Sequence, residues 1–403
     1  MNKDVYIVGA ARTAIGDFGG ALKDKTPAEL GVTVAKAAIE RAGIGADAVQ
    51  NVVIGQVIQS EPKDAYLARV IGVNAGVPVE APALTLNRLC GSGLQAIISA
   101  AQTLTLGEAD VALAGGAEVM SASPHVTKAA RFGTKMGNIQ MIDAMIATLS
   151  DPFEGMHMGV TGENVAEQYQ ISREAQDALA AQGHQRAAAA IAEGRFKEQI
   201  VPVELKTRKG TVLFDTDEHV RGETTVESLA SLKPAFKKEG GTVTAGNASG
   251  INDGAAAVVL ASGEAVKAKG LTPMAKIIGW GYAGVEPRIM GIGPVKAVPI
   301  ALERAGVTLD QIDLIEANEA FAAQACAVAN SLGFDAEKLN PNGSGIALGH
   351  PVGATGAILT VKAVYELQRT GGRYGLITMC IGGGQGIAMV IENVSANEQK
   401  AAA

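Results

Sequence analysis

Three short segments, far apart in the chain, each place a potentially reactive side chain in a glycine-rich turn. Cys90 lies within residues 87–93, His350 follows Gly349, and Cys380 is followed closely by three glycines. Glycine has no Cβ, so such a turn lets the backbone approach a ligand closely. Two thiols and an imidazole brought together at these turns could carry out covalent acyl chemistry.

Cys90 is the first candidate nucleophile. It lies between a strand-like stretch at residues 82–86 and a helix expected to begin near Gly93. A helix N-terminus carries a partial positive charge and free N–H donors, and both favour a thiolate. The competing interpretation is a buried and inert cysteine, which is a common role for this residue. The two other segments favour the catalytic interpretation.

His350 and Cys380 are of the types that a thiol nucleophile needs beside it. An imidazole near Cys90 could accept the thiol proton. Cys380 follows a strand expected at residues 376–379, and a second thiol at that place could act as a general acid or base. The backbone N–H groups of Cys90 and Gly382 could bind a developing oxyanion.

Two more residues carry weaker signals. Cys326 falls in an alanine-rich helix expected at residues 322–329, and we interpret it as core filler. Asn318 lies at the turn before that helix, in apolar surroundings. Its amide either caps the helix or holds a catalytic water.

Alternating strand and helix patterns indicate how these turns are positioned. Strands are expected at residues 5–10, 52–58, 111–115 and 255–261, and helices at residues 30–42 and 94–106. This alternation predicts a helix-covered sheet that is parallel or mixed. In the less regular middle of the chain, helices are expected at residues 161–169 and 172–192, with Thr161 and Ser172 as their N-caps.

A short repeat indicates two related halves. Residues 40–44 (ERAGI) recur 263 positions later as residues 303–307 (ERAGV). The turn at Cys90 has a counterpart at His350, 260 positions later. The nearly equal offsets favour a duplication whose halves are separated by an inserted segment, residues 121–246.

Composition excludes several classes of protein. The 403 residues predict two or three domains, and the 47% hydrophobic content supports a large core. A net charge of −7 and 4% aromatic residues argue against nucleic-acid binding. Three cysteines fit a reducing compartment, and neither a signal peptide nor a membrane span is recognisable. We therefore expect a soluble, cytoplasmic protein that binds neither nucleic acid nor membrane.

Several motifs together resemble the signature of the thiolases. The central ones are NRLCGSG at residues 87–93, NEAF at 318–321, GHP at 349–351 and CIGGG at 380–384. Others are similar to the biosynthetic-type acetyl-CoA acetyltransferases and the related bacterial β-ketothiolases: HMG at 157–159, FDTDEHVR at 214–221 and the stretch 241–257. The resemblance extends over the chain to about residue 393.

The resemblance implies an α/β architecture, a duplicated thiolase-like fold. Two similar mixed β-sheet halves with helices in layers would carry an inserted loop domain. The expected divisions are an N-terminal domain with Cys90 (1–120 plus 247–273), the inserted loop domain (121–246), a C-terminal domain with His350 and Cys380 (274–393), and a disordered tail (394–403).

The resemblance also implies an acetyl-CoA C-acetyltransferase, which joins acetyl-CoA and acyl-CoA into 3-ketoacyl-CoA by a reversible Claisen condensation. Cys90 would carry the acyl group, His350 would activate Cys90, and Cys380 would remove the α-proton of acetyl-CoA. His350 and a water on Asn318 would form one oxyanion hole. The N–H groups of Cys90 and Gly382 would form the other. The CoA thioesters are substrates, so neither a metal nor a redox cofactor is expected.

The CoA-binding positions of the family fall mainly in the inserted segment. They correspond here to Leu149, His157, Met158, Arg221, Ser228, Ala245, Ser249 and Phe321. Gly222 and Glu223 depart from the family pattern, in which a histidine and a small residue commonly follow the arginine. Residues 121–143 resemble the loop by which tetrameric thiolases join two dimers, so a homotetramer is expected.

Other interpretations stay open at this point. A degradative 3-ketoacyl-CoA thiolase of longer chain range would use the same chemistry, with Met158 as a candidate wall of the acyl pocket. An acyl-CoA or lipid carrier on the same fold would need no catalytic residues, although all of them are present. A metal-binding protein would use Cys90, His350 and Cys380, but CxxC and HxxxH spacings are missing. A ketosynthase would need a histidine in place of Cys380.

Overall fold

The computed structural model describes residues 4–394. The tail predicted to be disordered lies, from residue 395 onward, outside the described residues. Ten strands form one hydrogen-bonded sheet system in the order β12-β13-β14-β11-β1-β10-β5-β3-β4, with short β2 paired to β10. The antiparallel pairing of β1 with β11 joins an N-terminal and a C-terminal group of strands.

The N-terminal group is mixed. Strand β3 runs parallel to β4 and β5, whereas β10 is antiparallel to β5 and β1. Its strands are β1 (Val5–Arg12), β2 (Gly16–Asp17), β3 (Asn51–Gly55), β4 (Ala83–Leu86), β5 (Val111–Val119) and β10 (Asn252–Ser262). Its helices are α1 (Pro27–Arg41), α2 (Leu67–Asn74), α3 (Ser92–Leu106) and α8 (Gly263–Lys269).

Helix α1 shows how local sequence sets these boundaries. The Thr26 hydroxyl accepts the Glu29 N–H, and the Glu29 carboxylate accepts the Thr26 N–H, which forms a capping box. Pro27 suits the first helical turn, because N–H groups in this turn have no partner within the helix. The N–H that proline lacks therefore costs no hydrogen bond. Gly43, at a φ of 69°, ends the helix in the left-handed region.

The C-terminal group repeats this plan. Strands β12 and β13 are parallel, and β14 is antiparallel to both β13 and β11. The strands are β11 (Ala275–Gly284), β12 (Leu314–Ala317), β13 (Tyr374–Ile381) and β14 (Gln385–Asn393). The helices are α9 (Gly293–Ala305), α10 (Ala322–Leu332), α11 (Gly345–Leu348) and α12 (Thr355–Thr370).

Equivalent irregularities confirm the duplication that the repeat predicted. The pairing register shifts between Ile7 and Gly9 in β1, and between Ile277 and Gly279 in β11. A Cβ on Gly9 would collide with the backbone of α1, and one on Gly279 would collide with the backbone of α9. Each half thus seats its first helix on a glycine beside a bulge.

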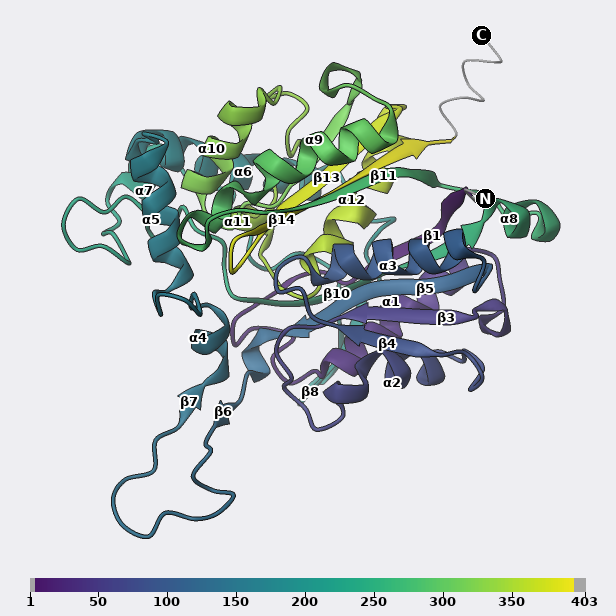
Figure 1. Ribbon diagram of the computed structural model, residues 1–403, viewed down its shortest axis with the longest axis horizontal. Coiled ribbons are helices and arrows are strands. Elements are labelled where there is room, and N and C mark those ends of the chain that lie inside the picture. Colours follow the sequence, from purple (N-terminus) through teal and green to yellow (C-terminus); the bar gives the residue numbers. More distant parts are fainter. Residues whose placement is uncertain (1–3, 395–403) are drawn as a thin grey trace.

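The two strand groups lie one above the other, with α3 and α12 between them (Figure 1). Helices α1 and α2 cover the outer face of the N-terminal strands, and α9 covers that of the C-terminal strands. Buried aliphatic residues such as Ile97 and Ile358 fill the central layer. Gly93 and Gly356 let the first turns of α3 and α12 pack backbone against backbone. The turns that precede these two helices therefore meet.

The inserted segment lies at one end of the molecule, and a long loop between β6 and β7 projects from it (Figure 1). Its elements are β6 (His125–Val126), β7 (Ile142–Asp143), α4 (Ala144–Thr148), α5 (Met158–Gln168), α6 (Arg173–Ala192), β8 (Val203–Thr207), β9 (Gly210–Phe214) and α7 (Val226–Ala230). Short 3-10 helices complete the described chain: η1 (Ala46–Ala48), η2 (Asp64–Tyr66), η3 (Met120–Ala122), η4 (Pro287–Ile292) and η5 (Leu309–Gln311).

One of the two predicted caps in this segment is wrong. Ser172 caps α6, as expected, because its hydroxyl accepts the Ala175 N–H. Thr161 lies inside α5, where its hydroxyl donates to the Met158 carbonyl. His157 is the N-cap instead, since its Nδ1 accepts the Gly159 N–H. A histidine cap is uncommon, which is why the sequence pattern missed it.

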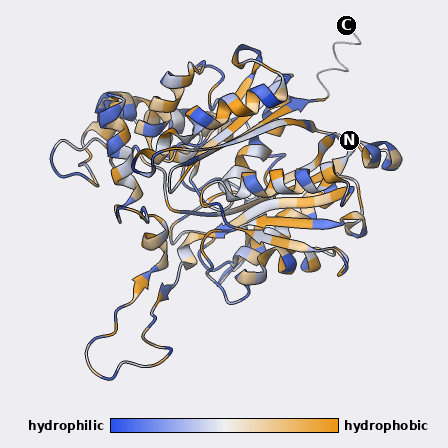
Figure 2. Cartoon of the chain, in the orientation of Figure 1, coloured by the Kyte–Doolittle hydropathy of each residue, from blue (hydrophilic) through white to orange (hydrophobic). Residues whose placement is uncertain are grey.

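Hydrophobic residues concentrate on the strands at the centre of the molecule (Figure 2). Within residues 4–394, none of the helices combines the length and the apolar character needed to cross a bilayer.

Candidate active site

Cys90, His350 and Gly382, which come from three distant segments, line one narrow cavity. Leu149, Met158, Ser249 and Phe321, four of the predicted CoA-binding residues, share its wall. The remaining lining residues are mostly apolar: Val57, Leu89, Thr148, Met290, Ala320 and Val352. About 50 Å³ of free space remains between them. The cavity therefore suits a small, mainly apolar group held against a thiol.

A strained turn presents Cys90 to the cavity. Leu89 has a φ of 45°, a left-handed conformation that costs a residue with a Cβ about 1–2 kcal/mol. The Ser92 hydroxyl holds the turn by donating to the Leu89 carbonyl at 2.7 Å and accepting the Arg88 N–H at 2.9 Å. The left-handed conformation of Leu89 lets the chain pass from β4 to α3 in a few residues. It leaves Cys90 half-buried.

The protonation of Cys90 differs from the expectation. Burial raises the pKa of its thiol, even though the N–H groups of Gly382 and of Cys90 itself point to the sulfur and lower it. Glu118 adds a smaller contribution that raises the pKa. The helix N-terminus thus does not leave a resting thiolate, because desolvation outweighs the backbone donors. A base must remove the proton. The two N–H groups are nevertheless those predicted for an oxyanion hole.

His350 is held as a neutral imidazole. The Thr355 hydroxyl donates to the Pro351 carbonyl at 2.9 Å, so its oxygen must accept the Nδ1–H of His350, 2.6 Å away. This assigns the proton to Nδ1 and leaves Nε2 as a free base. Burial lowers the pKa of His350 to about 4, so the ring stays uncharged near neutral pH.

Asn318 lies beside this base. Its Nδ2 is 3.4 Å from His350 Nε2, and the residue is buried. Phe321, not Asn318, is the N-cap residue of α10. The capping interpretation of Asn318 is therefore wrong, because the chain continues for three residues in a docked loop before the helix begins. The amide is left to act toward His350.

Cys380 lies behind the cavity. It is the next-to-last residue of β13, close to the turn that follows this strand. It is fully buried in a cluster with Met158, Met290 and Phe321. Burial raises the pKa of its thiol strongly, and Cys90 raises it further. Met158, Met290 and Phe321 also line the cavity, so Cys380 lies directly behind the cavity wall.

The other predicted CoA-binding residues lie outside the cavity wall. His157 stacks on Phe236, with ring centroids 4.8 Å apart, next to the cavity. Arg221, Ser228 and Ala245 are exposed in the inserted segment. The Arg221 backbone N–H donates to His184, and the Ser228 hydroxyl donates to the Thr225 carbonyl. The loop of Ser249 docks on the loop of Phe321, since the Ser249 N–H donates to the Ala320 carbonyl.

Sequence reasoning missed several residues that build the site. Met290 and Leu89 line the cavity, Thr355 orients His350, and the Asn252 side chain accepts the His350 N–H. Thr355 had a usable signal, because it lies five residues after His350 at a helix start. Met290 had none, because one methionine in an irregular segment carries no pattern. Cys326, expected in the core, is half-buried, and burial raises the pKa of its thiol to about 11.

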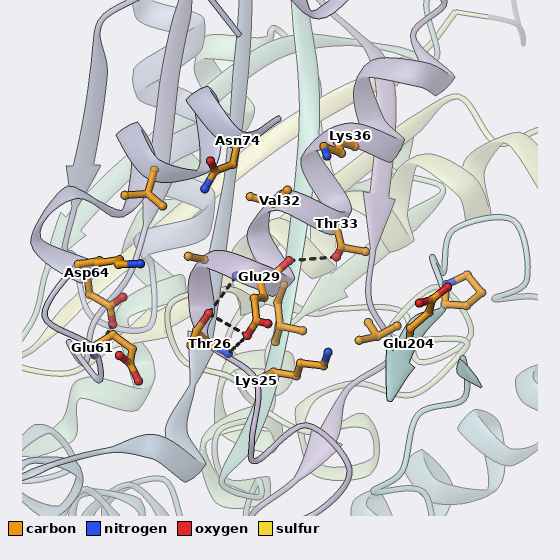
Figure 3. Close-up of a pocket in the computed structure, with 16 residues that line it drawn as sticks. Lys25, Thr26, Glu29, Val32, Thr33, Lys36, Glu61, Asp64, Asn74 and Glu204 are labelled. Carbon is orange, nitrogen blue, oxygen red and sulfur yellow. Dashed lines mark hydrogen bonds between the residues drawn. The ribbon is translucent and has the colours of Figure 1, made fainter. Parts of the chain in front are cut away.

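A larger cavity, of about 680 Å³, lies elsewhere, between α1, the region of α2 and the start of β8. Figure 3 shows Thr26 and Glu29 there, engaged in the α1 capping box, with Lys25, Lys36 and other charged residues around them. None of its lining residues in the described chain is a cysteine or a histidine. Within residues 4–394, no three His, Cys, Asp or Glu side chains group as metal ligands would.

Known proteins share both the sequence and the fold. A β-ketothiolase, BktB, of Cupriavidus necator is 59% identical over 98% of this chain and all of that protein. An acetyl-CoA acetyltransferase of Chromobacterium violaceum is 51% identical over 96% of this chain and 99% of that protein. Human mitochondrial 3-ketoacyl-CoA thiolase superposes with a TM-score of 0.95 at 47% identity, covering 97% of this chain and 99% of that one. The same human enzyme has been solved in complex with CoA.

Family models give the same assignment. The thiolase N-terminal domain matches residues 5–264, and the thiolase C-terminal domain matches residues 271–393. Together with the cavity that Cys90, His350 and Gly382 line, these matches show that the chain belongs to the thiolase family.

Proposed function

We propose that this protein is an acetyl-CoA C-acetyltransferase, a β-ketothiolase that catalyses the reversible condensation of acetyl-CoA with an acyl-CoA to 3-ketoacyl-CoA. The observation that carries the proposal is the shared cavity of Cys90, His350 and Gly382, with Cys380 buried behind it. The acyltransferase names of the relatives at 50–59% identity support the same reaction.

The first step is transfer of the acyl group to Cys90. The thiol gives its proton to His350 Nε2, and the sulfur attacks the thioester carbonyl. The carbonyl oxygen, as it becomes negative, accepts hydrogen bonds from the Cys90 and Gly382 N–H groups. The C–S bond to CoA then breaks and CoA leaves as a thiolate, while the proton from Cys90 stays on His350 Nε2. Proton balance requires the unprotonated Nε2 that Thr355 secures.

The second step joins two carbons. The departing CoA thiolate takes the proton of the Cys380 thiol. The Cys380 thiolate then takes the α-proton of acetyl-CoA, and the resulting enolate carbon attacks the acyl carbonyl on Cys90. The C–S bond to Cys90 breaks, and the Cys90 sulfur takes back the proton held by His350 Nε2. Cys90, as a thioester, no longer carries a proton or a negative charge, so the contribution by which it raises the pKa of Cys380 is removed. The enolate oxygen accepts hydrogen bonds from the Nε2–H that His350 gained in the first step and from a water on Asn318. The Asn318 Oδ1 has no hydrogen-bond partner among the described residues, which favours such a water.

CoA is proposed to bind mainly at the inserted segment. Leu149, Met158, Ser249 and Phe321 surround the thioester end, and His157 lies beside them on Phe236. The exposed Arg221, Ser228 and Ala245 are proposed to contact the pantetheine and nucleotide parts farther out. The CoA thioesters are substrates, and the proposed steps use only groups of the chain and of these substrates. The absence of a resident cofactor and the cytoplasmic location stay predictions.

The proposed assembly is a homotetramer, built as a dimer of dimers through residues 121–143. The loop between β6 and β7 projects from the body and exposes Phe132, Met136 and Met141, and Figure 2 shows hydrophobic residues on β7 as well. Exposed apolar side chains of this kind mark association surfaces. The division into domains at residues 120, 246 and 273 is likewise proposed. Light scattering on a Phe132→Ser/Met136→Ser variant tests the assembly; a dimer is expected, and a tetramer would count against it.

Two variants test the reaction. Cys90→Ser should form no acyl-enzyme from acetyl-CoA. Cys380→Ser should form it but not condense it, because the step that this thiol serves comes second. Intact-protein mass spectrometry after acetyl-CoA addition should therefore show one acetyl group on the second variant only. Acetylation of Cys90→Ser, or none on Cys380→Ser, would contradict the assigned roles.

A further inference from the structure

Glu118 is a buried carboxyl group near the end of β5, and its hydrogen bonds within residues 4–394 come from backbone groups, not from a basic side chain. It lies on β5 and is fully buried. Its oxygens accept the N–H groups of Val57 at 2.9 Å, Ile58 at 3.1 Å and Gly353 at 2.9 Å. Burying a carboxyl costs several kcal/mol, so three bonds to backbone groups from distant segments need a reason.

The three donors belong to the two sides of the active site. Val57 lines the cavity next to Cys90, and Ile58 packs in the same apolar cluster as Val352 and Cys90. Gly353 belongs to the turn that begins with His350 and leads into α12. Oε2 accepts from both Val57 and Gly353, so one atom joins the two sides.

The contact is tight as well as bonded. A Cβ on Gly353 would collide with the Glu118 carboxylate, and a Cβ on Gly116, two residues earlier on β5, would collide with the Gly353 carbonyl. The strand and the turn are therefore in backbone contact, and the carboxylate fills the space that remains. A shift of either side would break at least one of the three hydrogen bonds.

We propose that Glu118 is a positioning residue, which holds the Val57–Ile58 wall and the His350 turn at a set separation so that His350 reaches the Cys90 thiol. This inference rests on the proposed roles of Cys90 and His350. Glu118 itself touches neither substrate nor reacting atoms in the proposed steps.

The three N–H donors fit the ionised form of Glu118, which predominates above its pKa. A carboxylate is an acceptor only, and all three neighbours are N–H donors. Burial raises the pKa of Glu118 to about 8, the three N–H groups lower it, and Asp64 raises it. Asp64 is itself held by Gln56 and Ser60 in the same loop. The Cys90 thiol is the other titratable group that Glu118 acts on, and the charge of Glu118 raises the Cys90 pKa.

The charge of Glu118 leads to two expected effects of opposite sign, one on the acidity of Cys90 and one on turnover. A carboxylate near Cys90 disfavours the thiolate, so it does not serve to activate the nucleophile. Removing the charge should make the thiol more acidic and yet slow the enzyme, because the His350 turn loses its register. A residue that only stabilises the fold would not produce this opposite pair of effects.

Two substitutions separate geometry from charge. Glu118→Gln keeps the size but removes the charge and one acceptor. Glu118→Asp keeps the charge but is one methylene too short to reach both sides. Turnover in thiolysis should fall at least about tenfold in each, since misplacement by about 1 Å is this costly. The pH midpoint for alkylation of Cys90, followed on its own peptide by mass spectrometry, should fall by about one unit in Glu118→Gln only.

Glu163→Gln is the matched control. Glu163 is also a buried carboxyl that accepts backbone N–H groups, from Thr242 and Val243, but it does so within the inserted segment. Its variant should keep the alkylation midpoint of the wild type. An unchanged midpoint in Glu118→Gln, or wild-type turnover in Glu118→Asp, would overturn the proposal. Failure of both Glu118 variants to fold would also overturn it, because Glu118 would then serve the fold rather than the site. Failure of the proposed function itself would show separately, in the acetylation test of Cys90→Ser and Cys380→Ser.

Discussion

The two halves of the molecule share one plan but place different chemistry at the equivalent turn. In the N-terminal half, the turn before α3 holds Cys90 half-exposed on a strained backbone. In the C-terminal half, the turn before α12 holds His350 buried, with both ring nitrogens in contact with polar neighbours. Burial raises the pKa of the acid and lowers that of the base. Both groups are therefore uncharged at rest, and charge develops only when a substrate arrives.

The largest effect is expected when the base of the C-terminal half, His350, is removed. His350→Ala should lower turnover in thiolysis by about 10²- to 10⁴-fold, the usual contribution of a general base. The alkylation of Cys90 at neutral pH should also slow, because a thiol with a raised pKa would have no partner to take its proton. Steady-state rates and alkylation of the Cys90 peptide measure the two effects. Unchanged alkylation would mean that Cys90 does not depend on His350.

The tautomer of His350 can be tested more finely. Thr355→Val removes the oxygen that accepts the Nδ1–H, which leaves a buried donor unpaired or moves the proton to Nε2. Either result costs about 1–3 kcal/mol, so turnover should fall about ten- to a hundredfold.

Matched variants identify the cause of that loss. Thr355→Ser keeps the hydroxyl and should restore most of the activity. Thr360→Val, on the same helix, loses only a bond to the Gly356 carbonyl and should leave turnover near that of the wild type. Equal losses in Thr355→Val and Thr360→Val would show that helix stability, not the tautomer, is at stake.

The sequence anticipated the chemistry better than the support around it. Cys90, His350 and Cys380 stood out because a rare residue type beside glycines is visible in a one-dimensional pattern. Glu118 was missed because its partners are backbone groups, one of them more than 200 residues away. Thr355 was missed although it lies five residues after His350, because its contact with the His350 ring depends on how the turn folds. The net pKa of Cys90 was also misjudged, because the helix terminus is readable from the sequence whereas the depth of burial is not.

The acyl pocket depends on both halves of the molecule, because each half contributes residues to its wall. Leu89 and Val57 come from the N-terminal half, and Met290 comes from the C-terminal half. The narrow free space predicts that thiolysis is fastest with 3-ketoacyl-CoA of four or five carbons. Rates across a series from four to ten carbons measure this. A maximum at eight carbons or more would contradict the short-chain preference.

Met290→Ala should move that maximum by one or two carbons and change relative rates several-fold, since a few methylenes in an apolar pocket are worth about 1–3 kcal/mol. Met389→Ala is the control, because Met389 is equally buried but packs in the central core. It should lower stability without changing the preferred chain length. A shift in both variants would mean that general loosening, not the pocket wall, controls length.

The smallest effect concerns stability. It involves His184, which is a buried histidine like His350 but lies in the inserted segment. Burial lowers the pKa of His184 to about 4, with smaller contributions from His219 and Arg221. The unfolded chain takes up this proton near pH 6.5, whereas the folded protein resists it. The stabilisation is therefore present above pH 6.5 and is lost as the pH falls toward 4.

His184→Asn keeps an acceptor for the Arg221 N–H and should show a smaller fall in melting temperature between pH 7 and pH 5 than the wild type. His350 contributes with the same sign, and Glu118 and Glu319 with the opposite sign, but all three act equally in both proteins. His125→Asn, on exposed β6, should match the wild type. If His184→Asn matched it too, His184 would be protonated alike in the folded and unfolded states, and burial in the inserted segment would not keep a histidine neutral as it does in the C-terminal half.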